Sequence, residues 1–307
     1  MIAAFVIGTL AVAGIAISID DDDNAAETAS DPVDEPSSGP NNQPTDSHDL
    51  LQFDGDDDEI DAGSGYDTVH AGGGDDSVSA GLGKDVVYGE GGDDSVSGGE
   101  FHDILYGNSG DDQLNGDGGL DALFGGGGQD TLDGGGWNDH LDGGNGADSL
   151  MGGLGNDELI GVNHNRVLTA EEIAAIRDED NPDLLEDYLF TTEADGADTL
   201  DGGAGEDYLA LGKGDIGTGG EGLDEFELHL SQDGAGIITV TDYNAAEDVV
   251  QIVLDDDSVT INPDDYTVER DEETGDALIL ERGEVVSRLL GAGDTFTAEN
   301  LMLIGAV

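Results

Sequence analysis

Aspartate recurs at a fixed interval in the middle of the chain. From residue 53 to residue 160 it occupies the sixth position of twelve consecutive nine-residue units. Regularly spaced carboxylates are ligands for hard divalent cations such as Ca²⁺ and Mg²⁺. The twelve are Asp58, Asp67, Asp76, Asp85, Asp94, Asp103, Asp112, Asp121, Asp130, Asp139, Asp148 and Asp157. A second, shorter block adds Asp198, Asp207, Asp215 (after a one-residue deletion) and Asp224. We take all of them as candidate metal ligands.

Each unit has a glycine-rich half followed by a short extended half, as in 71–79 and 152–160. The fourth position is Gly in nine of twelve units, and the eighth is aliphatic in all twelve. Glycine permits the positive φ of tight turns, and one aliphatic side chain flanked by polar ones points inward from a strand. Two units therefore form one coil of 18 residues around a narrow Val/Leu core, and the coils stack as parallel strands.

The coil step suits calcium. Asp76 and Asp94 would face each other across one step of about 4.8 Å, and two such carboxylates repel by about 3–4 kcal/mol at an effective dielectric near 20. Ca²⁺ binds oxygens at about 2.3–2.6 Å, so two opposite ligands lie about 4.6–5.2 Å apart. Mg²⁺ requires shorter distances, and zinc favours His or Cys, which the repeat does not supply regularly. Pairing within each block allows at most ten sites in the first and two in the second, so up to about twelve Ca²⁺.

The pattern Gly-Gly-x-Gly-x-Asp-x-aliphatic-x resembles the RTX, or haemolysin-type calcium-binding, repeat, over about 140 residues in two blocks. The resemblance implies a parallel β-roll that binds Ca²⁺. It also implies export by a type I secretion apparatus that reads an uncleaved C-terminal signal. The end of the chain, 296–307, is similar to such a signal in its lack of positive charge and its apolar finish.

Three units depart from the pattern. Phe101 and Trp137 replace Gly at the fourth position, where a large side chain disfavours positive φ, and the first unit begins Phe53-Asp-Gly-Asp56. We expect the sites that use these turns to be weaker or empty. The extra acids Asp75, Asp93 and Asp111 are interpreted as solvated turn residues.

Other segments flank the repeats. Residues 1–19 are apolar without Lys or Arg, which leaves open an uncleaved membrane anchor, a cleaved signal or a buried helix. Residues 20–52 predict a disordered acidic linker. Residues 161–192 predict a helical insert, with a capping box at 169–172 and Asn181-Pro182 before a second apolar run, and the second repeat block covers 193–227. A β-rich cap, with strands expected near 227–230, 237–241, 249–253, 267–269, 277–280 and 285–290, covers 228–307.

Composition limits the function classes. The chain has 7 Lys+Arg against 73 Asp+Glu, a net charge of −66, which excludes phosphate-directed nucleic-acid binding and polybasic contact with lipid. With no Cys, disulfides and Cys-based sites are excluded as well. Neither His-Glu-x-x-His nor Gly-x-Ser-x-Gly occurs, and once the linker, repeats and cap are counted, only about 30 residues remain, too few for an enzyme domain.

The sequence therefore predicts an all-β protein. Its parallel β-roll carries a helical insert and a C-terminal β cap, and follows an N-terminal hydrophobic helix. We expect it to be secreted or extracellular, with 1–19 as the only membrane contact, and to fold on binding Ca²⁺. The expected role is non-catalytic, structural or adhesive, with cell-surface or self-association partners. The alternative is an accessory calcium-binding module of a secreted enzyme that acts on polysaccharides or peptides and has an unrecognised active site.

Overall fold

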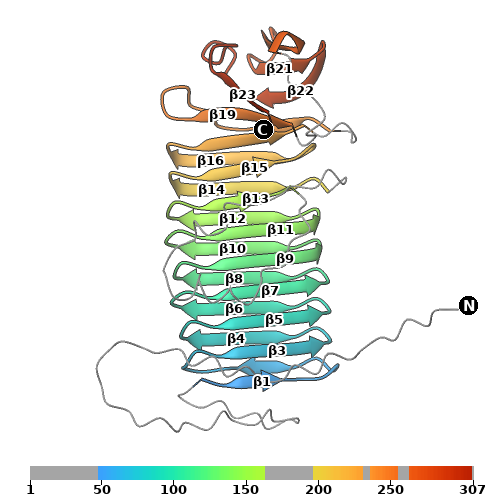
Figure 1. Ribbon diagram of the computed structural model, residues 1–307, viewed down its shortest axis with the longest axis vertical. Coiled ribbons are helices and arrows are strands. Elements are labelled where there is room, and N and C mark those ends of the chain that lie inside the picture. Colours follow the sequence, from blue (N-terminus) through green and yellow to red (C-terminus); the bar gives the residue numbers. More distant parts are fainter. Residues whose placement is uncertain (1–47, 163–195, 231–235, 255–262, 306–307) are drawn as a thin grey trace, which may run out of the picture. The chain divides into compact units, whose positions relative to one another are not determined.

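The structure is a computed structural model that describes residues 48–162, 196–230, 236–254 and 263–305. From β1 to β19 the strands in these ranges alternate between two sheets, and neighbours within each sheet run parallel (Figure 1). The 11-stranded sheet, here sheet A, contains β1 (Leu50–Gln52), β3 (Thr68–Gly73), β5 (Val86–Gly91), β7 (Ile104–Ser109), β9 (Ala122–Gly128), β11 (His140–Gly146), β13 (Glu158–Ile160), β15 (Tyr208–Leu211), β17 (Glu225–His229), β19 (Val249–Leu254) and β23 (Leu301–Gly305).

The 12-stranded sheet, here sheet B, is built in the same way and ends in a hairpin-like extension. It contains β2 (Glu59–Asp61), β4 (Ser77–Leu82), β6 (Ser95–Glu100), β8 (Gln113–Gly118), β10 (Thr131–Gly136), β12 (Ser149–Leu154), β14 (Thr199–Gly205), β16 (Ile216–Gly222), β18 (Ile238–Val240), β22 (Glu284–Leu289), β21 (Ala277–Glu281) and β20 (Tyr266–Arg270). The all-β parallel solenoid predicted from the repeat is confirmed.

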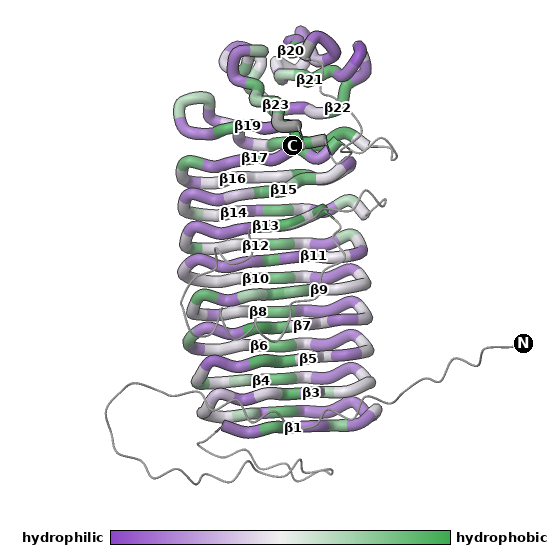
Figure 2. Tube along the Cα trace, in the orientation of Figure 1, coloured by the Kyte–Doolittle hydropathy of each residue, from purple (hydrophilic) through white to green (hydrophobic). Residues whose placement is uncertain are grey.

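The core is a column of aliphatic side chains between the two sheets. Val69 pairs with Val87 in sheet A and Leu132 with Leu150 in sheet B, so that equivalent positions stack from coil to coil. These residues are 0–1% exposed, and Figure 2 shows the hydrophobic segments in the middle of successive strands. Burying each Val or Leu contributes roughly 1.5–3 kcal/mol, so the eighth position of the repeat supplies the main hydrophobic stabilisation.

The roll continues past the predicted insert without losing its register. Strand β12 pairs with β14, with Leu150 opposite Leu200, and β13 pairs with β15, with Leu159 opposite Leu209. The two repeat blocks therefore form one continuous roll. Apart from Gly161 and Val162, the predicted helical insert lies outside the described residues.

The N-terminal boundary of the roll needs a correction. Strand β1 begins at Leu50 and pairs with β3. The roll therefore begins before residue 52, where the predicted linker was expected to end. The predicted apolar segment 1–19 lies outside the described residues. Within the part of the chain that the structure describes, no helix is long and apolar enough to cross a membrane.

The C-terminal segment continues the roll and then closes it. Strands occur at each of the six places where the sequence predicts them, and a short 3₁₀ turn, η2 (Pro263–Asp265), precedes β20. Strands β20, β21 and β22 pair antiparallel, whereas β18 with β22 and β19 with β23 remain parallel. Strand β23 lies within the segment that resembles a secretion signal, and it is the last strand of sheet A.

Candidate metal centres along the two turn edges

Each candidate aspartate immediately precedes a strand. Because the strands alternate between the two sheets, the aspartates form two rows. The row that precedes the strands of sheet A is called the sheet A edge, and the other row is called the sheet B edge. The sheet A edge contains Asp49, Asp67, Asp85, Asp103, Asp121, Asp139, Asp157, Asp207, Asp224 and Asp248. The sheet B edge contains Asp58, Asp76, Asp94, Asp112, Asp130, Asp148, Asp198 and Asp215. The sixteen predicted residues thus come together in two ladders.

On each edge, every aspartate after the first accepts a backbone hydrogen bond on one carboxylate oxygen. The N–H of Asp112 donates to Oδ1 of Asp130 at 2.8 Å, and the N–H of Asp121 donates to Oδ1 of Asp139 at 2.8 Å. The same bond joins every consecutive pair on both edges, at 2.7–3.2 Å. These bonds fix the orientation of the carboxylates along the roll.

The second oxygen, Oδ2, is left for another ligand. It is buried and accepts no hydrogen bond in Asp76, Asp94, Asp112, Asp121, Asp130, Asp139, Asp157 and Asp207. A buried carboxylate oxygen without a partner is costly unless a cation or a proton satisfies it. These orphaned oxygens point to a ligand that binds along both edges.

A glycine lies beside Oδ2 of most of these aspartates, whereas Asp76 has Ala71 at the equivalent position. A Cβ built on Gly107 would lie 2.2 Å from Oδ2 of Asp112 and 2.8 Å from the carbonyl oxygen of Gly125. The equivalent Cβ on Gly134 would lie 2.6 Å from Oδ2 of Asp139. In the described residues no three acidic, His or Cys side chains converge on one point, so backbone carbonyls would have to complete a metal shell. A space lined by one carboxylate oxygen and turn carbonyls fits Ca²⁺, which takes six to eight oxygen ligands.

Burial makes these carboxylates hard to ionise without a cation. Loss of hydration raises the pKa of Asp121 to about 9 and that of Asp139 to about 8 on the sheet A edge. On the sheet B edge the same cause raises the pKa of Asp130 to about 7 and that of Asp94 to about 6. Neighbouring carboxylates add to each shift. A bound divalent cation removes this penalty, because its charge stabilises the ionised form.

Comparison with known families identifies the repeat. The model of the RTX calcium-binding nonapeptide repeat matches four segments, residues 54–87, 88–123, 124–159 and 194–215. The repeat region is an RTX calcium-binding β-roll. The match covers nearly all of the first block and residues 194–215 of the second, and the parallel solenoid agrees with it.

Three solved structures are similar to parts of the chain, and no curated protein matches it. A hyperactive, Ca²⁺-dependent, β-helical antifreeze protein from an Antarctic bacterium is 21% identical, with a TM-score of 0.44, over 68% of this chain and 59% of that one. The AlgE6R3 subunit of the Azotobacter vinelandii mannuronan C5-epimerase is 20% identical, with a TM-score of 0.21, over 54% and 78%. Extracellular lipase LipA from Serratia marcescens is 15% identical, with a TM-score of 0.25, over 85% and 39%. The chain thus spans well under two thirds of the antifreeze protein and the lipase.

Two turns of the RTX roll carry large side chains. Phe101 and Trp137 have φ of 82° and 89°, whereas Gly83 and Gly155 at equivalent turns have φ of 149° and 143°. The peptide planes of these two turns are therefore oriented differently from those of their neighbours. The carboxylate ladder nevertheless passes through them, since the N–H of Asp85 still donates to Oδ1 of Asp103 at 2.8 Å. That their calcium sites are weaker stays a prediction.

The RTX ladders are longer than the sequence reasoning proposed. Asp49 and Asp248 extend the sheet A edge at its two ends, through bonds to Asp67 and Asp224. Their signal was present, because each is followed two residues later by an aliphatic residue, as in the repeat. Two more links cross the insert, from Asp148 to Asp198 and from Asp157 to Asp207. Counting within separate blocks could not find these four links.

The extra acids next to the ladder aspartates behave differently. Asp75 and Asp93 are exposed, and Oδ1 of Asp75 accepts a hydrogen bond from the N–H of Asp93 at 3.0 Å. Their carboxylates lie at the water boundary rather than in the oxygen-lined spaces. This placement agrees with their interpretation as solvated turn residues.

Proposed function

We propose that the protein is an extracellular, non-catalytic structural or adhesive protein whose roll folds when Ca²⁺ binds along both edges. Each ladder aspartate whose Oδ2 accepts no hydrogen bond would supply that oxygen to an ion, and turn carbonyls would supply the other ligands. The observation that carries the proposal is the row of buried Oδ2 atoms without hydrogen-bond partners, repeated coil after coil. The sixteen links between consecutive aspartates set an upper limit on the number of edge sites, higher than the twelve expected from separate blocks.

Calcium would control folding through mass action. A site with Ca²⁺ at a hundredfold excess over its Kd stabilises the folded form by about 2.7 kcal/mol, provided that the unfolded chain does not bind. Extracellular calcium modules typically have Kd values of about 10⁻⁴–10⁻³ M, far above cytosolic calcium. The chain would therefore stay unfolded before export, through a type I apparatus in our proposal, and fold outside the cell.

A calcium titration followed by far-UV circular dichroism tests the coupling. We expect a cooperative gain of β signal between micromolar and about 10 mM Ca²⁺, and a much weaker response to Mg²⁺, which prefers shorter bonds and octahedral geometry. An unchanged spectrum across the Ca²⁺ range would refute metal-coupled folding. Fractionating cells that express the chain with and without residues 1–19 tests the location. Release of the shortened chain into the medium supports a tether, and retention of both forms in the cytosol refutes an extracellular role.

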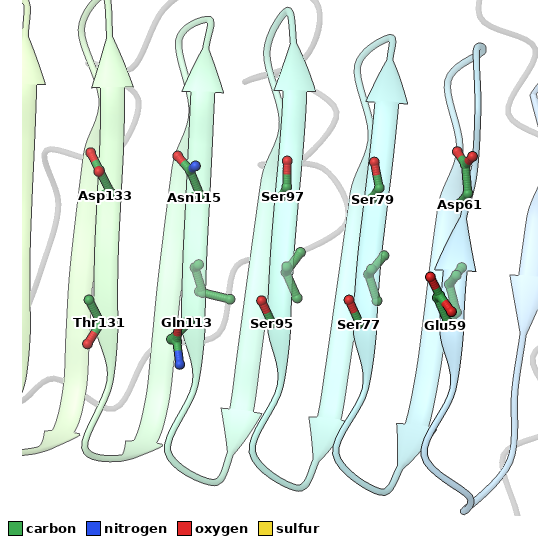
Figure 3. A pocket seen from close by; sticks show the side chains of 14 residues that line it. Glu59, Asp61, Ser77, Ser79, Ser95, Ser97, Gln113, Asn115, Thr131 and Asp133 are labelled. Carbon is green, nitrogen blue, oxygen red and sulfur yellow. The ribbon is translucent and has the colours of Figure 1, made fainter.

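A second candidate role is the binding of a polysaccharide, which would make the chain an accessory module of a secreted enzyme. A shallow groove of about 600 Å³ runs across β2 to β10 on the outside of sheet B. Figure 3 shows its two rows of polar side chains, with Ser95, Gln113 and Thr131 in one and Ser97 and Asn115 in the other. Hydroxyl and amide groups repeated at the strand spacing suit the hydroxyls of a linear sugar polymer.

Affinity electrophoresis in Ca²⁺ tests this role. We expect neutral polysaccharides to retard the protein more than acidic ones, because the net charge of −66 repels polyanions. The double variant Ser95→Ala, Ser97→Ala should lose retardation, whereas Ser149→Ala, outside the groove, should not. Equal migration with and without every polysaccharide would exclude the second role.

A further inference from the structure

The turns of the sheet A edge carry exposed apolar side chains. In five consecutive turns, one of the third to fifth positions of the repeat is Leu, Phe or Trp. These residues, called the turn row, are Leu82, Phe101, Leu120, Trp137 and Leu154. Leu82 and Phe101 are 47% and 54% exposed, Trp137 and Leu154 are 70% and 67% exposed, and Leu120 is partly exposed. In a chain with a net charge of −66, such a run of exposed apolar residues indicates an interaction surface.

The turns of the sheet B edge in the first block have the opposite composition. Their third to fifth positions contain Gly, Ser, Asn, Gln, Ala and Asp, but no Leu, Phe or Trp. Five acids occupy these positions, namely Asp56, Asp57, Asp75, Asp93 and Asp111. In the five turns of the turn row, Glu100 is the one acid at these positions. Both edges build the same coils and stack in the same way (Figure 1), so the fold itself does not require apolar side chains at a turn.

Two members of the turn row occupy strained turns. Phe101 and Trp137 have φ of 82° and 89°, which is unfavourable for a residue with a Cβ. More than half of each residue is exposed, so contacts within the roll offset little of this strain. Backbone strain of this kind persists at functional positions. A contact outside the single roll therefore accounts for these two residues better than the stability of the roll does.

The turn row reads the same in both directions. Leu82 and Leu154 occupy third positions, Phe101 and Trp137 occupy fourth positions, and Leu120 occupies the fifth position of the central turn. Strand pairing keeps equivalent positions in line from β4 to β12. With coils about 4.8 Å apart, the two aromatic residues lie one step on either side of the central turn, and the outer leucines lie two steps away. The row is therefore about 19 Å long and symmetric about its centre.

We propose that the turn row is the contact surface between two antiparallel copies of this chain, related by a two-fold axis that crosses the roll at Leu120. Such an interface is isologous, so every contact occurs twice. Leu82 meets Leu154 of the second copy, Phe101 meets Trp137 of the second copy, and Leu120 meets its own equivalent. The inference deepens the structural or adhesive role proposed above and rests on it only in requiring a folded roll.

A parallel pair of copies fits less well. An axis along the roll would place third positions opposite fifth positions, so that Leu82 would face Lys84 and Leu154 would face Asn156. Apolar side chains would then meet polar ones, which leaves the polar groups without the hydrogen bonds they make in water. The antiparallel arrangement pairs apolar residues with apolar residues throughout.

The antiparallel arrangement also keeps acids apart. Glu100 would face Gly136 of the second copy. Asp117 lies in the central turn, but its carboxylate accepts hydrogen bonds from Oγ of Ser97 at 2.6 Å and Nδ2 of Asn115 at 2.9 Å, both in sheet B. These bonds hold the carboxylate on sheet B. Like charges opposite each other would oppose association, and the sheet A turns have few of them.

Sedimentation velocity of the full chain in saturating Ca²⁺ tests the dimer. A stable interface takes about 20–30 residues a side, whereas the row has five, so we expect weak association with a Kd of about 10–100 µM. Phe101→Asp with Trp137→Asp should weaken it at least tenfold. Gln129→Asp with Ala147→Asp adds the same charge to exposed sheet B turns and should change the Kd less than threefold. A wild-type chain that stays monomeric up to 300 µM, or equal dimerisation of the two double variants, would overturn the proposal.

Circular dichroism of the same samples separates this result from a failure of calcium-coupled folding. A chain that gains β signal with Ca²⁺ and stays monomeric contradicts the dimer alone. Flotation with phosphatidylcholine vesicles examines the rival occupant of an apolar row. A folded monomer that floats with the vesicles, and no longer floats after Phe101→Asp with Trp137→Asp, would overturn the proposal and assign the row to a lipid surface.

Cross-linking tests the two-fold axis directly, because the chain has no Cys of its own. Leu120→Cys alone should give covalent dimers with a short bis-maleimide. Leu82→Cys alone and Leu154→Cys alone should give few, since equivalent residues of the two copies lie four coil steps, or about 19 Å, apart. A mixture of Leu82→Cys and Leu154→Cys should give dimers. Equal yields from Leu82→Cys alone and from the mixture would refute the antiparallel arrangement.

Discussion

The two sheets of the roll are alike inside and different outside. Inward residues such as Leu123 in sheet A and Leu132 in sheet B are both 0% exposed and stack on equivalent neighbours. Outward residues differ, with Tyr106 7% exposed in sheet A and Ser95 exposed in sheet B. The nine-residue pattern thus specifies the roll. The residues on either side of the aliphatic position differ between the sheets, and they are buried on the face of sheet A and exposed on that of sheet B.

Matched core substitutions should have the largest effect and should be equal in the two sheets. Leu123→Ala and Leu132→Ala each remove a fully buried side chain, which costs about 2–5 kcal/mol of unfolding free energy. Urea unfolding in saturating Ca²⁺ measures both. A difference of more than about 1.5 kcal/mol, beyond the usual spread for one substitution type, would show that the sheets differ inside as well.

Substitutions on the outer faces should separate the sheets. We expect Tyr106→Ala to cost about 2–4 kcal/mol, because it removes a buried ring that is stacked on both sides. Ser97→Ala on sheet B should change the free energy of unfolding by less than about 0.5 kcal/mol. Tyr106→Phe is the control, and it should be neutral or stabilising because the Tyr106 hydroxyl is buried without a hydrogen-bond partner. Equal small effects of Tyr106→Ala and Ser97→Ala would show that burial of the Tyr106 ring adds nothing to stability.

The parts of the fold that follow from a period could be predicted from the sequence. Asp at the sixth position and an aliphatic residue at the eighth identified the roll, its core and sixteen of the eighteen ladder residues. Repetition makes the prediction secure, because each coil meets the same physical demands as its neighbours. Asp49 and Asp248 were missed because their units lack the glycines, although each keeps the aspartate and the aliphatic residue.

Features that depend on contacts between distant coils could not be predicted in this way. Nothing in a single unit shows that Asp148 pairs with Asp198 across 50 residues, or that Tyr106 and Phe124 lie on one face. The orphaned Oδ2 of Asp112 and the space beside Gly107 also require three-dimensional positions. The sequence indicates which residues are candidate calcium ligands. The structure shows how a backbone N–H donates to one carboxylate oxygen and leaves the other oxygen without a hydrogen bond.

Individual ladder aspartates should also differ in their pH dependence. In the metal-free roll burial raises the pKa of Asp121 to about 9 but that of Asp94 only to about 6, against about 3.9 in the unfolded chain. The folded form therefore binds more protons than the unfolded one. The stability of the metal-free roll is greatest below about pH 4 and is lost as the pH rises through these raised values. Calcium affinity changes in the opposite direction, since Ca²⁺ requires the ionised carboxylate.

Calcium titrations at several pH values measure this difference. We expect the wild-type midpoint to fall up to about pH 9, because a group with a pKa near 9 is ionised about tenfold less for each unit below that value. Asp121→Asn should remove most of the change between pH 8 and pH 9, whereas Asp94→Asn should leave it intact. Identical pH profiles for the two variants would show that Asp121 and Asp94 ionise over the same pH range.

The smallest predicted effect concerns Trp137, one of two large residues at turns of the sheet A edge. Its φ of 89° costs about 1–2 kcal/mol for a residue with a Cβ, and its side chain is 70% exposed, so little packing offsets the strain. Trp137→Gly should therefore raise the free energy of unfolding by about 1 kcal/mol in urea with saturating Ca²⁺. Trp137→Ala removes the ring but keeps the Cβ, so it should change stability much less. If both variants destabilise the roll, the ring makes contacts that stabilise this turn and offset its backbone strain.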